Sequence, residues 1–158
     1  MPDIRKIFQP DGVDTLLQRA LGRHALFLDG DPGRFRGVVS WGAVSHLAAF
    51  GGLAFPRFRL VQGDQILDEN LYIRRDQRAY PRALVSETGA LLRQGALLAI
   101  DGLELLHEPV AELCAAIEAA VQTQVAAELY ACWVEGAPRA TQWDDHETLL
   151  LQIDGKKE

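Results

Sequence analysis

The sequence predicts an α+β fold in one domain that spans residues 1–158. Two observations lead to this prediction. Helical patterns dominate the first part of the chain, and strand-like apolar runs gather towards its end. The length of 158 residues suits one domain, and a hydrophobic content of 48% is enough for a core. We find no internal repeat, low-complexity tract or linker that would divide the chain.

The first elements are helical. Asp11 or Asp14 can cap a short helix that runs to about Leu21. The apolar run 24–28 (HALFL) predicts a short buried strand. Ser40 then precedes a helix over 41–50, whose apolar residues recur at helical spacing.

The middle of the chain alternates between strands and polar segments. Residues 55–61 alternate apolar and basic side chains, which predicts a half-exposed strand. Residues 68–81 are polar, and the interval from Arg57 to Arg82 contains six arginines. Two interpretations of 68–81 stay open: a solvated loop, or a loop that faces an acidic or phosphate-bearing partner. A helix over 87–94, begun by Ser86, follows this segment.

The clearest elements follow in the second half. The run 96–100 (ALLAI) is typical of a buried strand, and Asp101-Gly102 turns the chain. Residues 108–122 are predicted to form a helix, because their apolar residues recur at helical spacing and a proline occupies the first helical position. Residues 125–134 are rich in residues that favour strands.

Composition excludes several classes of protein. The net charge is −6 and no long basic run is present, which argues against direct nucleic-acid binding. The first ten residues lack the apolar core of a signal peptide, and no apolar run approaches the roughly 20 residues of a membrane span. Cys114 and Cys132 lack metal-type spacing, so we expect two buried free thiols in a cytoplasmic protein.

The segment 141–157 (TQWDDHETLLLQIDGKK) concentrates possible ligands ahead of an apolar run. In a regular strand, Gln142, Asp144 and His146 share one face. A carboxylate and an imidazole two residues apart can bind one metal ion, and this pair of ligand types suits non-haem iron. The spacing alone leaves a solvated turn at the start of a strand as the alternative.

The same segment closely resembles the metal-binding strand and following turn of the Jumonji C (JmjC) proteins of the bacterial cupin type, which are similar to ribosomal oxygenases. Upstream, GALLAIDGLELLHEPVAELCAAIEAA resembles the family's strand, turn and long helix, and VAAELYACW its next strand. The likeness covers about residues 24–158 and is specific from about 96 onward.

The resemblance implies a helical N-terminal part leading into a double-stranded β-helix (cupin or jelly-roll), truncated after its first metal-binding strand. It implies a dioxygenase, an oxidoreductase that uses Fe(II) and 2-oxoglutarate to hydroxylate a protein, peptide or amino-acid side chain. Asp144 matches the carboxylate iron ligand. Lys157 matches the lysine that pairs with 2-oxoglutarate, and Tyr130 matches a tyrosine that lines the same pocket.

The chain departs from the family pattern at three points. Gln142 replaces the first iron-binding histidine, and His146 substitutes for it only in a shifted register. Glu128 replaces the usual asparagine before Leu-Tyr. The third ligand of the family lies downstream of the position matched by Glu158, so we expect no turnover from these residues alone.

Three hypotheses follow from this pattern. The chain is the N-terminal part of an Fe(II)/2-oxoglutarate oxygenase, a non-catalytic cupin-like binding module (a pseudo-oxygenase) with a degenerate iron site, or a structural, dimerising fragment. A half-built β-helix leaves a strand edge uncovered, so we also expect marginal stability or self-association, with a homo-oligomer as one form.

Overall fold

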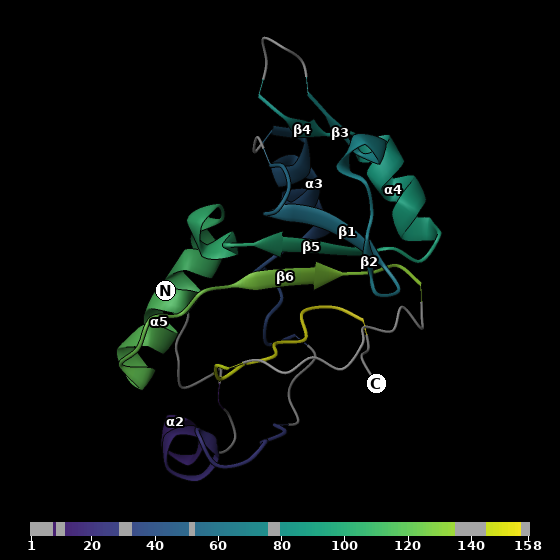
Figure 1. The fold of residues 1–158 in the computed structure, drawn as a ribbon. Helices are drawn as coiled ribbons and strands as arrows, with labels where there is room; N and C mark the ends of the chain where they lie inside the picture. The colour runs from purple at the N-terminus through teal and green to yellow at the C-terminus, as the bar shows by residue number, and fades with distance from the viewer. Residues whose placement is uncertain are drawn as a thin grey trace.

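A computed structural model describes residues 8, 12–28, 33–50, 53–75, 80–134 and 145–155. Helices and antiparallel sheets are combined in it, which confirms the α+β prediction (Figure 1). The helices are α2 (Gly12–Thr15), which continues as a π-helical turn over Leu16–Ala20, α3 (Trp41–Phe50), α4 (Val85–Arg93) and α5 (Glu108–Val121). The strands are β1 (Phe58–Gln62), β2 (Gln65–Ile66), β3 (Ile73–Arg74), β4 (Arg82–Ala83), β5 (Leu97–Asp101) and β6 (Glu128–Ala131).

The main sheet has four antiparallel strands in the order β2-β1-β5-β6. A tight turn joins β1 to β2, and Gly63 there has a φ of +60°, which glycine adopts without strain. Helix α5 lies between β5 and β6 along the chain (Figure 1). A separate pair of short strands, β3 and β4, joins Ile73 to Ala83 and Arg74 to Arg82 in register.

One face of the main sheet carries the principal core. Phe58, Leu60, Leu98 and Ile100 are at most 1% exposed, and they alternate along β1 and β5 as the pleat requires. Tyr72 packs against them, and its hydroxyl accepts a hydrogen bond from the Leu60 amide at 3.3 Å.

Helix α5 contributes to two apolar clusters. Val110 and Cys114 join the principal core. Leu113 and Ile117 join a second cluster that also contains Leu16 of the π-helical turn. Leu151, near the end of the chain, packs against this second cluster, so α5 lies between the sheet and both ends of the described chain.

The long elements confirm their predictions. Ser40 caps α3, because its Oγ accepts a hydrogen bond from the Ala43 amide at 3.1 Å. Pro109 lies in the first turn of α5, and Gly102 turns the chain after β5 with a φ of +67°. The strand predicted over 125–134 is shorter, since β6 comprises only Glu128–Ala131.

Two strand predictions are wrong. Residues 24–28 form no strand, and Phe27 is 87% exposed. The described part of the predicted metal-binding strand, residues 145–151 of the segment 141–157, also forms no strand, although Leu149 to Leu151 are apolar. Both runs have suitable side chains, but neither finds a partner in a described ladder, and a strand needs such a partner for its backbone hydrogen bonds.

The polar interval between β2 and α4 contains more structure than its composition indicates. Asp68 caps a single 3-10 turn by accepting a hydrogen bond from the Asn70 amide at 3.0 Å. Strands β3 and β4 follow, which we did not predict because each has only two residues. Helix α4 begins at Val85, so Ser86 lies inside the helix and does not cap it.

Candidate functional site

Tyr130 lies on β6, at one end of a polar row across the main sheet. It pairs with Ala99 of β5, which pairs with Arg59 of β1, so the three side chains share one face. On the same face Asp101 lies opposite Glu128. The Tyr130 hydroxyl donates a hydrogen bond to the Glu128 carboxylate, and the Arg59 guanidinium donates one to Asp101.

The electrostatics of this row are dominated by the pair of Arg59 and Asp101. Burial lowers the pKa of Arg59, but the hydrogen bond and charge of Asp101, with contributions from Tyr130 and Glu128, raise it above its ordinary value overall. Asp101 Oδ1 is buried and has no hydrogen-bond partner among the described residues. One guanidinium therefore faces two carboxylates, and the row carries a net negative charge.

The predicted iron ligands are only partly covered by the structure. Gln142 and Asp144 lie outside the described residues, and so does Lys157, the predicted cosubstrate anchor. His146 is described: its side chain is 68% exposed, and its Nδ1 lies 3.3 Å from Asp145 Oδ1. No described contact joins His146 to Tyr130.

The neighbour of His146 has a structural role that the sequence did not reveal. Glu147 Oε1 accepts a hydrogen bond from the Gly22 amide at 2.9 Å. The contact spans 125 positions of sequence, and it attaches the C-terminal segment to the end of the π-helical turn. Beyond it, the chain bends at Asp154 and Gly155, with a φ of +73° at Gly155, and the two lysines of the predicted Gly-Lys-Lys turn lie outside the described residues.

His107 and the two cysteines lie in different environments. His107 occupies the cap position of α5, and its Nε2 lies 3.0 Å from the Val38 carbonyl. Cys114 is buried, and burial raises the pKa of its thiol. Cys132 is exposed, so the prediction of two buried thiols is wrong for this residue. Among the described helices, none has the length and apolar character that crossing a membrane requires.

Of the residues that the resemblance assigns to iron and 2-oxoglutarate, the structure describes only His146 and Tyr130. Within the described ranges, no three histidine, cysteine, aspartate or glutamate side chains are grouped to hold a metal ion. At the expected cosubstrate position, the Tyr130 hydroxyl is already bonded to a carboxylate. A dianion such as 2-oxoglutarate would meet the negative charges of Glu128 and Asp101 there.

No family model, curated protein or solved structure matches this chain. The assignment of a function therefore depends on the residues and their geometry.

Sequence patterns alone did not identify the pair of Arg59 and Asp101. Arg59 was expected on the exposed face of its strand, and Asp101 was expected in a turn. The signal that would have found the pair is the antiparallel register of β1 and β5, which places the end of β5 beside the start of β1. That register is a tertiary property.

Proposed function

We propose that this chain is a cupin-like, non-catalytic binding module related to the JmjC oxygenases, with part of a double-stranded β-helix as its fold. The single observation that carries the proposal is the hydrogen bond from the Tyr130 hydroxyl to Glu128. The resemblance assigns Tyr130 to the cosubstrate pocket, where an active enzyme needs a hydroxyl free to donate to a carboxylate ligand. In this chain a carboxylate of the protein accepts that hydrogen bond.

The order of the elements supports the fold assignment. Strand β5, the turn at Gly102, the long helix α5 and strand β6 occur in the order that the resemblance implies. Strands β5 and β6 pair antiparallel, with Ala99 opposite Tyr130. The segment that resembles the metal-binding strand is the next one along the chain, separated from β6 by residues 132–140.

The sequence of that segment supports the loss of the reaction. Gln142 stands where the family has a histidine, and a neutral amide oxygen is a weak ligand for Fe(II). Glu128 stands where the family has asparagine, which adds a negative charge beside Tyr130. Both changes act against the same pair of groups, the metal and its dianionic cosubstrate. We propose that the module binds a protein, peptide or amino-acid partner without oxidising it.

Titration calorimetry with Mn(II) and 2-oxoglutarate tests the proposal. The unchanged chain is expected to show no saturable binding of 2-oxoglutarate at millimolar concentrations. The variant Gln142→His/Glu128→Asn is expected to gain binding, because it restores an imidazole ligand and removes the carboxylate that accepts a hydrogen bond from the Tyr130 hydroxyl. Each single variant serves as a control for the other. Saturable binding of 2-oxoglutarate by the unchanged chain would contradict the proposal.

A second candidate is an active Fe(II)/2-oxoglutarate oxygenase, favoured by the presence of Asp144 and Lys157 at two matching positions of the motif. It predicts that O2 oxidises 2-oxoglutarate to succinate and CO2 in the presence of Fe(II), while the second oxygen atom hydroxylates the substrate side chain. It also predicts that Lys157→Ala weakens cosubstrate binding, because the lysine charge is lost. Succinate formation above the level of an Asp144→Ala variant would favour this candidate over the binding module.

A further inference from the structure

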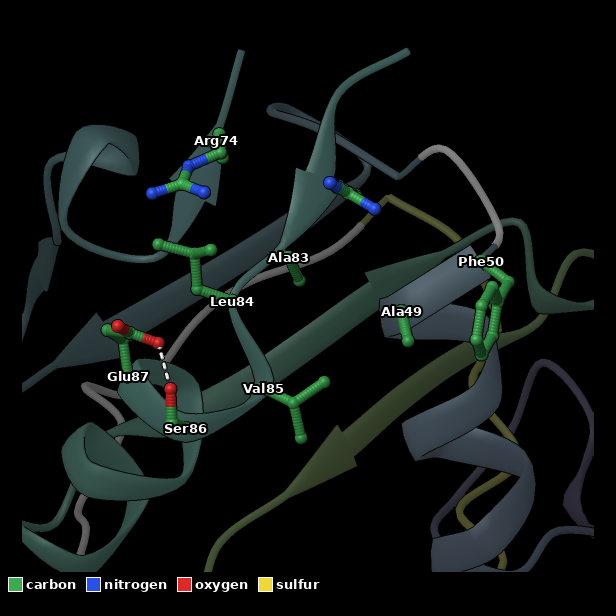
Figure 2. Close-up of a pocket in the computed structure, with 9 residues that line it drawn as sticks. Ala49, Phe50, Arg74, Ala83, Leu84, Val85, Ser86 and Glu87 are labelled. Atoms are coloured by element: carbon green, nitrogen blue, oxygen red, sulfur yellow. Dashed lines mark hydrogen bonds between the residues drawn. The ribbon is translucent and has the colours of Figure 1, made fainter. Parts of the chain in front are cut away.

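A depression of about 460 Å³ lies away from the polar row, where the β3–β4 pair meets two helices. Its lining contains two arginines, Arg74 and Arg82, together with the first turn of α4 and the last turn of α3. Figure 2 shows Arg74 near Leu84 and Glu87, with Phe50 on the opposite side of the depression. The site does not depend on any residue of the motif at 141–157.

The two arginines are directly opposite each other in the antiparallel pair. Residues in this relation have Cα atoms about 4.5–5.5 Å apart and side chains on the same face, and like charges there are destabilising. Neither guanidinium takes part in a hydrogen bond or ion pair with any residue that the structure describes. The adjacent Arg75 differs, since its Nη2 lies 3.0 Å from both carboxylate oxygens of Glu69.

Helix α4 adds donors to the same depression. Its cap residue Leu84 has no side chain that can accept a hydrogen bond from the first turn. The amides of Val85 and Ser86 donate to no described acceptor, and both residues line the depression. Unpaired amides at the start of a helix favour an anion. These amides strengthen a site whose main cations are the two arginines.

One acidic side chain limits the charge of this depression. Glu87 lines it, and its carboxylate accepts a hydrogen bond from the Ser86 hydroxyl (Figure 2). That hydrogen bond lowers the pKa of Glu87, and the charge of Arg74 contributes, so the group is ionised at neutral pH. The lining therefore has a net positive charge of one, from two arginines and Glu87, and it can still attract an anionic ligand.

The remaining wall of the depression is apolar. Phe50 is 77% exposed and Val85 is 48% exposed, although both are large hydrophobic residues. Ala49 and Ala83 complete this wall. A small inorganic anion would use only the guanidinium groups and leave the apolar wall uncovered. A ligand that carries an apolar ring beside its anionic group would use both.

We propose that this depression binds a phosphate monoester that is attached to an apolar or aromatic group. Two guanidinium groups match the oxygens of a phosphate dianion, and the exposed ring of Phe50 can stack against an aromatic group. A nucleotide and a phosphorylated tyrosine side chain both present this chemistry.

Nuclear magnetic resonance titration of the 158-residue chain with phenyl phosphate tests the site. Saturable shifts of the Val85 and Ser86 amides are expected, with a dissociation constant of about 1 mM or tighter. Binding of inorganic phosphate and of benzoate is expected to be several-fold weaker. Comparison of AMP with phosphotyrosine then distinguishes the two sources. The absence of saturable shifts, or binding of benzoate equal to that of phenyl phosphate, would overturn the proposal.

Variants of exposed residues make the test specific. Arg74→Gln and Arg82→Gln are each expected to weaken phenyl phosphate binding by about ten-fold, whereas Arg75→Gln should leave it unchanged. Glu87→Gln is expected to tighten binding, because it removes the only carboxylate among the lining residues. Thermal melts of each variant show whether the fold is retained. Equal losses in Arg75→Gln and Arg82→Gln would indicate general charge attraction and refute the site.

Discussion

Two buried hydroxyl groups of this protein have opposite environments. The Tyr72 hydroxyl accepts a hydrogen bond from the Leu60 amide of β1. This amide has no partner on a neighbouring strand among those described, so the tyrosine completes the hydrogen bonding of β1. The Thr88 hydroxyl is buried on α4 and has no partner within the described part of the chain. A satisfied buried hydroxyl stabilises the fold, whereas an unsatisfied one costs about 1–3 kcal/mol.

Replacing Thr88 with valine is expected to stabilise the protein by about 1 kcal/mol, because valine keeps the branched shape and removes the unpaired hydroxyl. Thr88→Ala is the matched control, which also removes a methyl group and should be less stable than Thr88→Val. Urea denaturation followed by circular dichroism gives both values. A destabilised Thr88→Val variant would mean that the hydroxyl has a partner.

Tyr72 gives the fold a dependence on alkaline pH. Burial raises the pKa of Tyr72 above its ordinary value of 10.0. Above pH 10 the unfolded chain therefore loses the tyrosine proton while the folded chain keeps it, and stability falls as pH rises. Tyr72→Phe should be less stable at neutral pH, through loss of the Leu60 hydrogen bond, and should show a shallower decline above pH 10. Identical slopes in the two proteins would contradict this assignment.

At the scale of elements, side-chain caps and buried apolar faces stabilise the helices of this chain. Helix α3 begins at a serine cap and ends at an exposed phenylalanine, with Val44 and Ala48 buried on its inner face. Helix α5 has no side-chain cap, but it buries Val110, Leu113 and Ile117 in two clusters. Burial of apolar side chains in these two clusters therefore stabilises α5 without a side-chain cap.

Ser40→Ala is expected to destabilise the protein by about 1 kcal/mol, because the Ala43 amide loses its acceptor. Ser45 is exposed in the middle of the same helix, so Ser45→Ala should be neutral or slightly stabilising. Chemical denaturation of both variants measures the difference between them. Equal effects of the two substitutions would show that Ser40 does not act as a cap.

Elements with a long periodic pattern were predictable from sequence. Helix α5 and strand β5 fall within a residue of their predicted bounds, since each buries an unbroken apolar surface. The conformations of the run 24–28 and the segment 145–151 could not be predicted from sequence, because strand formation depends on a partner elsewhere in the chain. For the candidate site, the resemblance predicts a role for Tyr130, whereas its bond to Glu128 needed the three-dimensional arrangement.

At the scale of the whole molecule, the main sheet has a short strand on each side. Strand β2 pairs only with β1, and β6 only with β5, among the described strands. Ile66 on β2 is 53% exposed, and Trp133 just beyond β6 is 48% exposed. Exposed strand edges with apolar side chains favour association between copies.

Sedimentation velocity is expected to show association that increases with protein concentration. A charged residue on an edge strand opposes such pairing, so Ile66→Lys should reduce it. Leu71→Lys is the matched control, since Leu71 is equally exposed at 53% and lies outside the strands. A monodisperse monomer at all concentrations would contradict the expectation. Equal effects of both variants would indicate general apolar association and not edge pairing.

The position of α5 between two apolar clusters also determines how the molecule opens. The sheet core and the cluster formed by both ends of the described chain share this helix, through Cys114 on one side and Ile117 on the other. Neither cluster can separate without exposing a face of α5. Its central amides should therefore exchange with solvent deuterium only when the whole molecule unfolds, more slowly than those of α2.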